Sequence, residues 1–586
     1  MRGRTLSWAL TGALALSALT PGAGAGAGEL DDDFVARLLP PSGSEHIFSN
    51  ALVAKAQPDE CFDGIGVDYP TPNPDGSCPQ GQPKVNQAYV WGLTQGGSEL
   101  WFGTAPNVHC LVVGGFLGGT TPQETRSWTC EFGQSEIARD NPLLPAAIGD
   151  WRPPKAYSYN LRTKQLTNRT PTAGPAALLF RATLGIRSAG SRGGVVFLAG
   201  PALNTSGGIN FFAFSSATGA LIDACSAPAF TNIRQWLVVG TQLYAGVGTA
   251  SGGGVLRWTG SLANPFRRSA GAANERCGFT NAGDLPGDAA YLTAVGTDRI
   301  AVSAWPTSLA GGSGAGVYLS PPFGANRALD PSDGAWARLW QPRDYDPDVV
   351  TSLTYAGGAI AYWRGALYFG TMHVPGLSAV FHASPACKAS PIGDDCYGPP
   401  SSTLSALELF LGSYRAISVW RINSPTSGPS AELLYGESKL PAYDPGIGHF
   451  VPESTGFTPT FGPSGFGNYF NNYTWSAAVF GGQLVFGTMD WSYLLAGAIP
   501  GVPDEIAEWF ARSPGKFGFG ADLIRFWSPN APAVTVNATG LGNYLNYGLR
   551  SFLVTQDGRG LFVGTANPMN LEAKGGWELR RLAKKN

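Results

Sequence analysis

The sequence Gly365-Ala366-Leu367-Tyr368-Phe369-Gly370-Thr371-Met372-His373 recurs in closely related form at residues 97–106, 481–490 and 558–567. Each copy starts with a glycine turn, continues as a short strand and ends with Gly-Thr at the opening of a loop. We call this the Gly-Thr motif. Repetition of one short motif indicates an architecture built from copies of a single unit.

Strand–turn–strand units of this kind can be counted seven times along the chain. Their hairpins span residues 88–104, 185–200, 235–248, 291–305, 358–371, 475–488 and 549–565. A third strand with aromatic alternation follows each hairpin, as at 416–421, and a weaker fourth strand follows a polar turn, as at 431–435. Four strands per unit, repeated in this way, predict an all-β fold, a seven-bladed β-propeller of four-stranded antiparallel blades.

On these repeats the chain resembles the seven-bladed β-propeller superfamily from about residue 45 to its end. No closer family is recognised: the repeats lack a WD dipeptide, and residues 555–560 only approximate a sialidase-type aspartate box. The last unit stops after its third strand, at Leu582. Because an open sheet edge invites aggregation, residues 46–54 are expected to pair there and close the ring.

The start of the chain predicts export. Arg2 and Arg4 precede the apolar run 6–19, and Ala25-Gly26-Ala27 offers small residues for cleavage, so residues 1–27 are expected to be a signal peptide. Residues 28–84 are expected to contain the ring-closing strand and a disulfide-stapled extension, and residues 85–586 the propeller. We predict a secreted or periplasmic protein.

The eight cysteines support that compartment. They form couples that are close in sequence, Cys61/Cys78, Cys110/Cys130, Cys225/Cys277 and Cys387/Cys396. Local disulfides are the expected use, although eight cysteines allow about 105 pairings. The cysteines form no C-x-x-C pattern, so no zinc site is predicted for them.

Composition excludes several classes of partner. The net charge is −2 and 14% of residues are charged, so there is no basic footprint for nucleic acid. After the predicted signal peptide the sequence contains no run of about 18 apolar residues, so membrane insertion is not predicted. The acidic loop 344–348 is a weak calcium candidate without EF-hand spacing, so the cofactor is left unassigned. The oligomeric state is also open.

Three long insertions mark one face of the predicted propeller. They follow the second strands of their units, at residues 105–154, 372–414 and 489–520, and second-to-third-strand loops share one face. Helix signals occur within two of them, at 403–411 and 503–512. Long ordered loops on a rigid scaffold usually serve binding or gating, although a purely protective cap is the alternative.

Polar residues follow the Gly-Thr motif on this face. They are His373, Asp490 and Asn567, with His109 further along the first insertion and Trp491 beside Asp490. His373 and Asp490 are candidates for a base with its orienting carboxylate, or for two metal ligands. Hydrogen bonding to a ligand and capping of loop amides remain the alternatives.

The loops that enter the innermost strands carry tyrosine, tryptophan and asparagine. Asn471, Tyr473, Asn546 and Tyr547 are expected to be exposed, with Trp91 at the corresponding place in the first unit. These side chains combine flat apolar faces with amide hydrogen bonds, which suits sugar rings or aromatic groups.

These features favour an exported propeller that binds an extracellular ligand, most readily a carbohydrate, on its loop-rich face. A polysaccharide lyase or glycoside hydrolase is the first alternative. In that case His373 or His109 would carry the proton, and the carboxylate of Asp490 would orient the histidine. A protein-interaction scaffold is the second. Propeller folds serve all three, so the fold alone does not decide.

Overall fold

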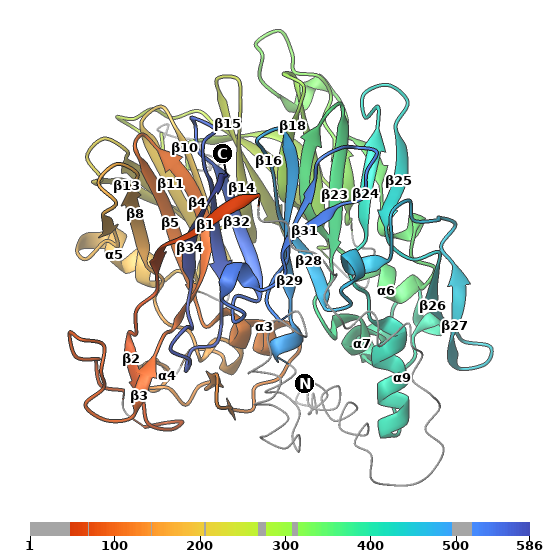
Figure 1. Cartoon of the computed structure of the whole chain (residues 1–586), viewed down its shortest axis with the longest axis horizontal. Helices are drawn as coiled ribbons and strands as arrows, with labels where there is room; N and C mark the ends of the chain where they lie inside the picture. The colour runs from red at the N-terminus through yellow and green to blue at the C-terminus, as the bar shows by residue number, and fades with distance from the viewer. Residues whose placement is uncertain are drawn as a thin grey trace.

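The computed structural model describes residues 47–67, 69–141, 143–203, 207–267, 277–307, 314–494 and 519–585. The proposed signal peptide (1–27) and the predicted helix at 503–512 lie outside these residues. The described chain forms a β-propeller-like, mostly β fold of four-stranded antiparallel sheets, whose strands stand upright in Figure 1.

Within each sheet the strands pair in chain order, apart from one sheet that takes its last strand from near the N-terminus. The first two sheets are β4 (Gln87–Gly96), β5 (Glu99–Pro106), β8 (Ala156–Asn160) and β9 (Leu166–Asn168), and then β10 (Ser188–Arg192), β11 (Val195–Pro201), β12 (Ile209–Ser215) and β13 (Leu221–Ala227). The next three are β14 (Asn232–Val239), β15 (Gln242–Thr249), β16 (Gly252–Trp258) and β17 (Phe279–Leu285); β18 (Asp288–Val295), β19 (Arg299–Trp305), β20 (Gly316–Leu319) and β21 (Ala337–Trp340); and β22 (Ala356–Trp363), β23 (Ala366–Met372), β24 (Val419–Asn423) and β25 (Ser430–Tyr435). The last two are β28 (Asn471–Phe480), β29 (Gln483–Asp490), β30 (Leu523–Phe526) and β31 (Val534–Asn537), and then β32 (Gly548–Val554), β33 (Leu561–Ala566) and β34 (Glu578–Lys584) with β1 (Phe48–Lys55).

Strand β1 covers the outer edge of β34. The two strands pair antiparallel, from Phe48 opposite Lys584 to Lys55 opposite Glu578, with an irregularity between Leu52 and Ala54. Figure 1 shows β1, near the red end of the colour scale, lying across the blue C-terminal strands. The pairing satisfies backbone groups that would otherwise form an open sheet edge.

The glycine of the Gly-Thr motif allows neighbouring sheets to approach closely. A Cβ atom added at Gly103, Gly370, Gly487 or Gly564 would lie 2.1 to 2.7 Å from an atom of the adjacent sheet or of the segment leading into it. At Gly370, for example, that atom belongs to Thr474 of β28. Any larger residue would force the sheets apart, so the repeated glycine is explained by packing.

The threonine of the motif aligns the third strand of its own sheet. The Oγ1 atom of Thr371 accepts a hydrogen bond from the backbone N–H of Ser418 at 2.9 Å. The same contact joins Thr104 to Lys155, Thr488 to Asp522 and Thr565 to Glu578 at 2.8 to 2.9 Å. The motif that reveals the repeat is therefore structural.

The insertions lie together at one end of the sheets, the lower end in Figure 1. The first contains α3 (Val108–Phe116), β6 (Gln123–Glu124), β7 (Thr129–Cys130), α4 (Glu136–Asp140) and η2 (Ala146–Ile148), and the second α7 (Leu377–His382), α8 (Pro385–Lys388), η5 (Gly393–Asp395) and α9 (Thr403–Ser413). Helix α9 confirms the helix predicted at 403–411. Of the insertion at 489–520, only its two ends are described.

Other elements connect or extend the sheets. They are β2 (Glu60–Phe62), β3 (Gln82–Lys84), α5 (Gly174–Arg181), η3 (Pro331–Asp333), η4 (Pro342–Asp344), α6 (Val349–Leu353), β26 (Lys439–Asp444), β27 (His449–Ser454), η6 (Ser464–Gly467) and η7 (Gly540–Gly542). The β26–β27 hairpin, which the sequence patterns did not reveal, packs against α9.

The predicted cysteine couples form disulfides in all four cases. Cys225–Cys277 joins β13 to the segment before β17, and we call it the inter-sheet disulfide. Four disulfides fit a secreted or periplasmic protein. Among the described residues, no helix has the length and apolar character needed to cross a bilayer.

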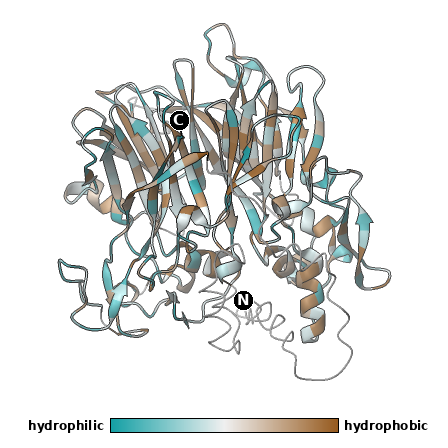
Figure 2. Ribbon diagram, viewed as in Figure 1, coloured by the Kyte–Doolittle hydropathy of each residue, from teal (hydrophilic) through white to brown (hydrophobic). Residues whose placement is uncertain are grey.

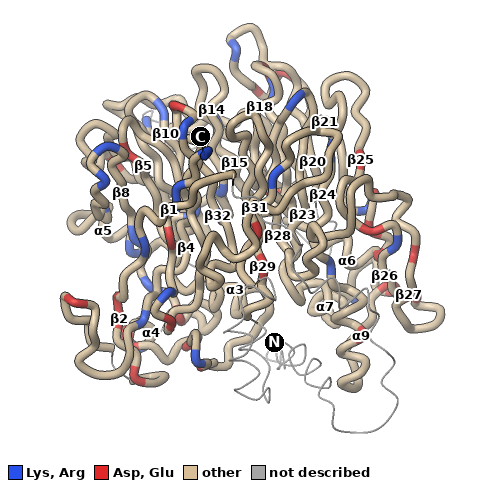
Figure 3. The backbone as a smooth tube through the Cα atoms, viewed as in Figure 1, with Lys and Arg blue, Asp and Glu red and all other residues tan. Residues whose placement is uncertain are grey.

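The core lies within and between the sheets. Apolar side chains from adjacent sheets form the buried clusters, and Figure 2 shows hydrophobic positions concentrated along the strands. In Figure 3, Lys and Arg are interspersed with Asp and Glu along the chain.

Candidate functional site

A cavity of about 820 Å³ lies at the end of the sheets that carries the insertions. Helices α3, α7 and α9 contribute wall residues such as Val112, Ala379 and Leu409. The ends of the strands contribute the rest, including Met372 of β23 and Met489 of β29. Most of the lining is apolar, so the cavity is suited to an apolar body rather than to a highly hydrated one.

Strand alternation decides which residues at the strand ends face the cavity. Met372 and Val374 line it, and so do Met489 and Trp491, whereas the residues between them do not. Consecutive side chains of an extended segment point to opposite sides. His373 and Asp490 therefore lie at the predicted places in the chain but face away from the cavity.

His373 is buried in the protein. Its Nε2 atom lies 2.9 Å from Thr371 Oγ1, and its ring makes an edge contact with Tyr355 at 4.1 Å between centroids. Burial, with a smaller effect of the charge on Arg415, lowers the pKa of His373 to about 3. A histidine with this pKa is neutral and a poor proton acceptor at neutral pH.

Asp490 belongs to a separate buried network. Its carboxylate accepts hydrogen bonds from the Nδ2 atom of Asn468 and the backbone N–H of Ser492, both at 2.7 Å. Burial raises the pKa of Asp490 to about 6. Among the described residues no hydrogen bond joins Asp490 to His373. The base-and-carboxylate pair expected from the sequence is not assembled.

The asparagines expected to be exposed are completely buried, so that expectation is wrong. Asn471 donates to Gly465 O and to Asp522 Oδ2, and Asn546 donates in the same way to Gly540 O and to Glu578 Oε2. Each amide thus fastens a glycine-rich loop to the first residues of a third strand. Their hydrogen-bonding groups hold the fold together instead of facing a ligand.

Asn567 has a similar structural role. It is 0% exposed, and its amide donates to Lys574 O at 2.8 Å and to Asn546 Oδ1 at 3.3 Å. Its own oxygen accepts a hydrogen bond from the backbone N–H of Met569. The loop-capping alternative considered for the residues after Gly-Thr describes Asn567 correctly.

The aromatic residues predicted to bind ligand do line the cavity. Tyr473, Tyr547, Trp91 and Trp491 all contribute to its wall. Tyr473 and Tyr547 are nonetheless only 8% and 4% exposed, so their expected exposure is wrong. The Tyr547 hydroxyl hydrogen-bonds the hydroxyl of Tyr89. These side chains offer ring faces and edges to a ligand.

His109 is the predicted catalytic residue that lines the cavity. It lies on α3, and its ring makes an edge contact with Trp128 at 4.9 Å between centroids. Burial lowers the pKa of His109 to about 4, so the ring is neutral at neutral pH. The cavity wall contains neither His373 nor Asp490, the predicted partners for acid–base chemistry.

The floor of the cavity has a different chemistry from its walls. Arg187, Arg234 and Arg550 reach it from the innermost part of three sheets, beside Trp305 and Trp475. Sequence reasoning missed these arginines. Each lies near the start of an innermost strand, and three such residues at equivalent positions of a repeat are the signal that points to a shared centre.

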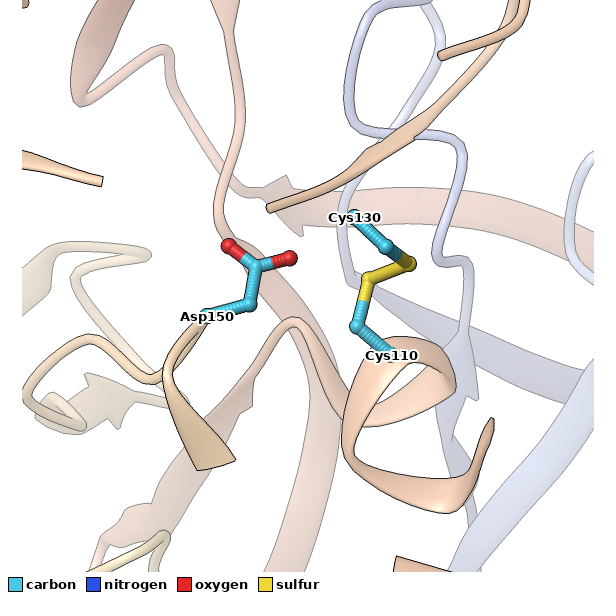
Figure 4. Close-up of side chains that lie close together, drawn as sticks. All are labelled: Cys110, Cys130 and Asp150. Atoms are coloured by element: carbon cyan, nitrogen blue, oxygen red, sulfur yellow. A yellow bond between two sulfur atoms is a disulfide. The ribbon is translucent and has the colours of Figure 1, made fainter. Parts of the chain in front are cut away.

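The metal candidates are not supported by their surroundings. Cys110, Cys130 and Asp150 lie together, but the two sulfurs form a disulfide and cannot act as thiolate ligands (Figure 4). In the acidic loop, Asp346 accepts from Arg415 and Tyr355, both at 2.7 Å.

The other carboxylates of that loop also have protein donors. Asp348 accepts from the backbone N–H groups of Thr351 and Tyr443, and Asp344 caps Gln341. Calcium at residues 344–348 is therefore not favoured, because the ligand oxygens are already used to fix local structure.

No known family model and no curated protein matches the chain. Solved structures with some likeness include one from an analysis of two prolyl endopeptidases, 8% identical, with a TM-score of 0.35, covering 86% of this chain and 51% of that one. A 6-phosphogluconolactonase candidate from Bacteroides uniformis is 9% identical, with a TM-score of 0.32, covering 70% and 84%.

An acylaminoacyl peptidase from Pyrococcus horikoshii is 8% identical, with a TM-score of 0.29, covering 82% of this chain and 57% of that one. The chain thus spans about half the length of the prolyl endopeptidase structure it matches. At these scores the likenesses support no inference about activity.

Proposed function

We propose that this protein is an exported seven-bladed β-propeller that binds a small extracellular ligand in the cavity at its insertion face. The innermost strands support the ring: β4, β10, β14, β18, β22, β28 and β32 each contact the next, and β32 contacts β4. Pairing of β1 with β34 supplies the fourth strand of the last blade and closes the ring.

The cavity itself carries the proposal. Its volume of about 820 Å³ falls in the range of small-molecule sites, about 300–1,000 Å³. Its wall combines helices of two insertions with the ends of several sheets, so its shape is fixed by many separate elements. A rigid concave site of this size on a repeat scaffold is the usual location for ligand binding.

The wall favours an aliphatic or aromatic ligand. The amides of Asn471 and Asn546, which were expected to bind a sugar, are committed to the loops they fasten. The remaining wall is mostly apolar. Carbohydrate, the ligand expected from the sequence, stays the second candidate because the rings of Trp91 and Trp491 line the same cavity and suit stacking on a sugar.

The test is a matched pair of tryptophan substitutions with calorimetric binding. Ala379→Trp on α7 places a large ring in the cavity, whereas Ala176→Trp on α5 is a similar change, partly exposed, that lines neither cavity described here. The probes are 1-octanol and a panel of soluble oligosaccharides. Product formation from the oligosaccharides is measured in the same samples.

Binding of 1-octanol that is lost in Ala379→Trp and kept in Ala176→Trp is the expected result. Oligosaccharide binding with the same dependence on Ala379 would instead establish the carbohydrate candidate, and new chain ends would make it an enzyme. Binding of neither probe, or binding that is unaffected by Ala379→Trp, would overturn the proposed site.

A further inference from the structure

We propose that Arg187, Arg234 and Arg550 form an anion-binding site at the floor of the cavity, which holds the carboxylate of a ligand whose apolar body fills the space above. This inference rests on the proposed function, because it names the chemical class of ligand for the same cavity. It concerns residues that no sequence motif assigned and that the proposed function does not require.

The three arginines converge on the central part of the molecule. Arg187 directly precedes β10, Arg234 lies near the start of β14, and Arg550 near the start of β32. All three line the large cavity. Arg234 and Arg550 also line a second cavity of about 580 Å³.

Two aromatic residues, Trp91 and Trp475, likewise line both cavities. The four shared residues therefore separate the two spaces, and the large cavity ends on an arginine–tryptophan floor. Apolar walls and a cationic floor therefore bound the same space.

Aromatic rings hold the guanidinium groups in place. The Cζ atom of Arg234 lies 3.8 Å from the ring centroid of Trp305, and Arg187 approaches the same ring at 5.5 Å. Arg550 lies 5.6 Å from the ring of Trp475. Ring faces attract the cations but accept no strong hydrogen bonds, so the planar N–H groups stay available to another acceptor.

Few protein acceptors satisfy these arginines. Arg187 donates from Nη1 to Asn232 Oδ1 at 2.7 Å, and Arg234 donates from Nη2 to the Tyr291 hydroxyl at 2.8 Å. The Nε atoms of all three arginines and Nη2 of Arg550 are buried without a hydrogen-bond partner. Buried donors of this kind normally have a partner, so four of them together indicate a missing acceptor.

The local charge is strongly positive. Asp288 of β18 is the carboxylate whose charge acts on Arg187, and it also accepts from Asn232. Glu124 is the single acidic residue among the described residues that line either cavity, and it is exposed at the insertion.

Burial and mutual repulsion act against the charges at the floor. Burial lowers the pKa of Arg550 to about 10 and, with repulsion from Arg234 and Arg550, lowers the pKa of Arg187 well below its usual value. Buried charges without a counterion are costly, so a bound anion would stabilise the floor.

A carboxylate matches both ends of the site. The fork of a guanidinium binds the two oxygens of a carboxylate in one plane, and several arginines can share them. An inorganic anion alone would leave the apolar wall without a ligand contact. A monocarboxylate with an aliphatic or aromatic body uses the donors at the floor and the apolar surface above it.

The test compares octanoate with 1-octanol and octyltrimethylammonium by calorimetry on the full mature protein. Octanoate should bind at least about 10-fold more tightly than 1-octanol, because the free energy of a hydrogen bond between charged groups corresponds to an affinity ratio of that size or larger. Octyltrimethylammonium should bind most weakly. Arg550→Met should weaken octanoate binding about 10-fold and leave 1-octanol binding within about 2-fold.

Arg162→Met, at an exposed residue that lines neither cavity, is the control and should change neither affinity. Without ligand, Arg550→Met should unfold at a higher temperature than the wild type, because it removes a repelling charge. If Arg550 had a merely structural role, the substitution would instead lower the unfolding temperature. If Arg550→Met does not fold, Arg187→Met, at a less buried side chain, takes its place.

The outcomes separate this inference from the proposed function. Equal affinity for octanoate and 1-octanol, or an octanoate affinity that survives Arg550→Met, would overturn the anion site and leave the ligand cavity standing. If Ala379→Trp abolishes binding of both probes and Arg550→Met changes neither, the ligand cavity is supported and the anion site is overturned. Binding of neither probe to the wild type would overturn both proposals.

Discussion

Asp522→Asn should remove part of the pH dependence of the free energy of unfolding. Asp522 is buried, accepts hydrogen bonds from Asn471 and Asn468, and has one carboxylate oxygen without a partner. Burial, reinforced by the nearby charge of Asp490, raises the pKa of Asp522 from 3.8 to about 7. Between these pH values the folded protein binds more protons than the unfolded chain, so the free energy of unfolding falls as pH rises.

The size of the effect follows from that interval. At 1.36 kcal/mol per pH unit, the interval between 3.8 and about 7 corresponds to about 4 kcal/mol at most. Stability from Asp522 is complete below about pH 4 and is lost by about pH 8. Asparagine keeps an acceptor for Asn471 and does not ionise, so the variant avoids this loss.

The assay is urea unfolding followed by tryptophan fluorescence from pH 4 to pH 8. The free energy of unfolding of Asp522→Asn, minus that of the wild type, should rise across this range by up to about 4 kcal/mol. Asp557→Asn, at an exposed turn, is the control and should give no such slope. A difference between Asp522→Asn and the wild type that stays constant with pH would refute the argument.

Three further predictions follow from the structure. His373→Gln should leave 1-octanol affinity unchanged while lowering the free energy of unfolding by about 1–2 kcal/mol, measured by urea titration; a large affinity loss would return His373 to the site. Replacing Cys110 and Cys130 by serine should weaken 1-octanol binding, because their disulfide anchors α3 at the cavity, whereas removing the inter-sheet disulfide should lower only stability, by about 2–4 kcal/mol. Deleting residues 47–55 should expose β34 and cause concentration-dependent aggregation in light scattering; a stable monomer would contradict the edge-covering role.

The sequence determined the strand units because their cause is local. Each hairpin has a period-2 pattern between glycine turns, and the Gly-Thr motif repeats because each copy has the same two structural roles. Gly370 leaves room for Thr474 of the adjacent sheet, and Thr371 accepts a hydrogen bond from the backbone N–H of Ser418. The disulfide couples were also predictable, since each joins cysteines that are close in sequence.

The site could be predicted only in part. Tyr473, Tyr547 and Trp491, which the sequence predicts to bind ligand, line the cavity, because equivalent positions of a repeat meet at one end of the sheets. The sequence assigned His373 and Asp490 to that cavity wrongly. A difference of one residue reverses the direction of a side chain on a strand, and repeat alignment alone does not fix that direction.

The tertiary structure alone decided the floor. Arg187, Arg234 and Arg550 come from three different sheets, and nothing in their local sequences shows that their guanidinium groups share one space. Their lack of acceptors is likewise a property of the assembled centre, since it depends on every neighbouring side chain at once. Local patterns determine the elements, whereas charge and burial at a convergence point depend on residues far apart in the chain.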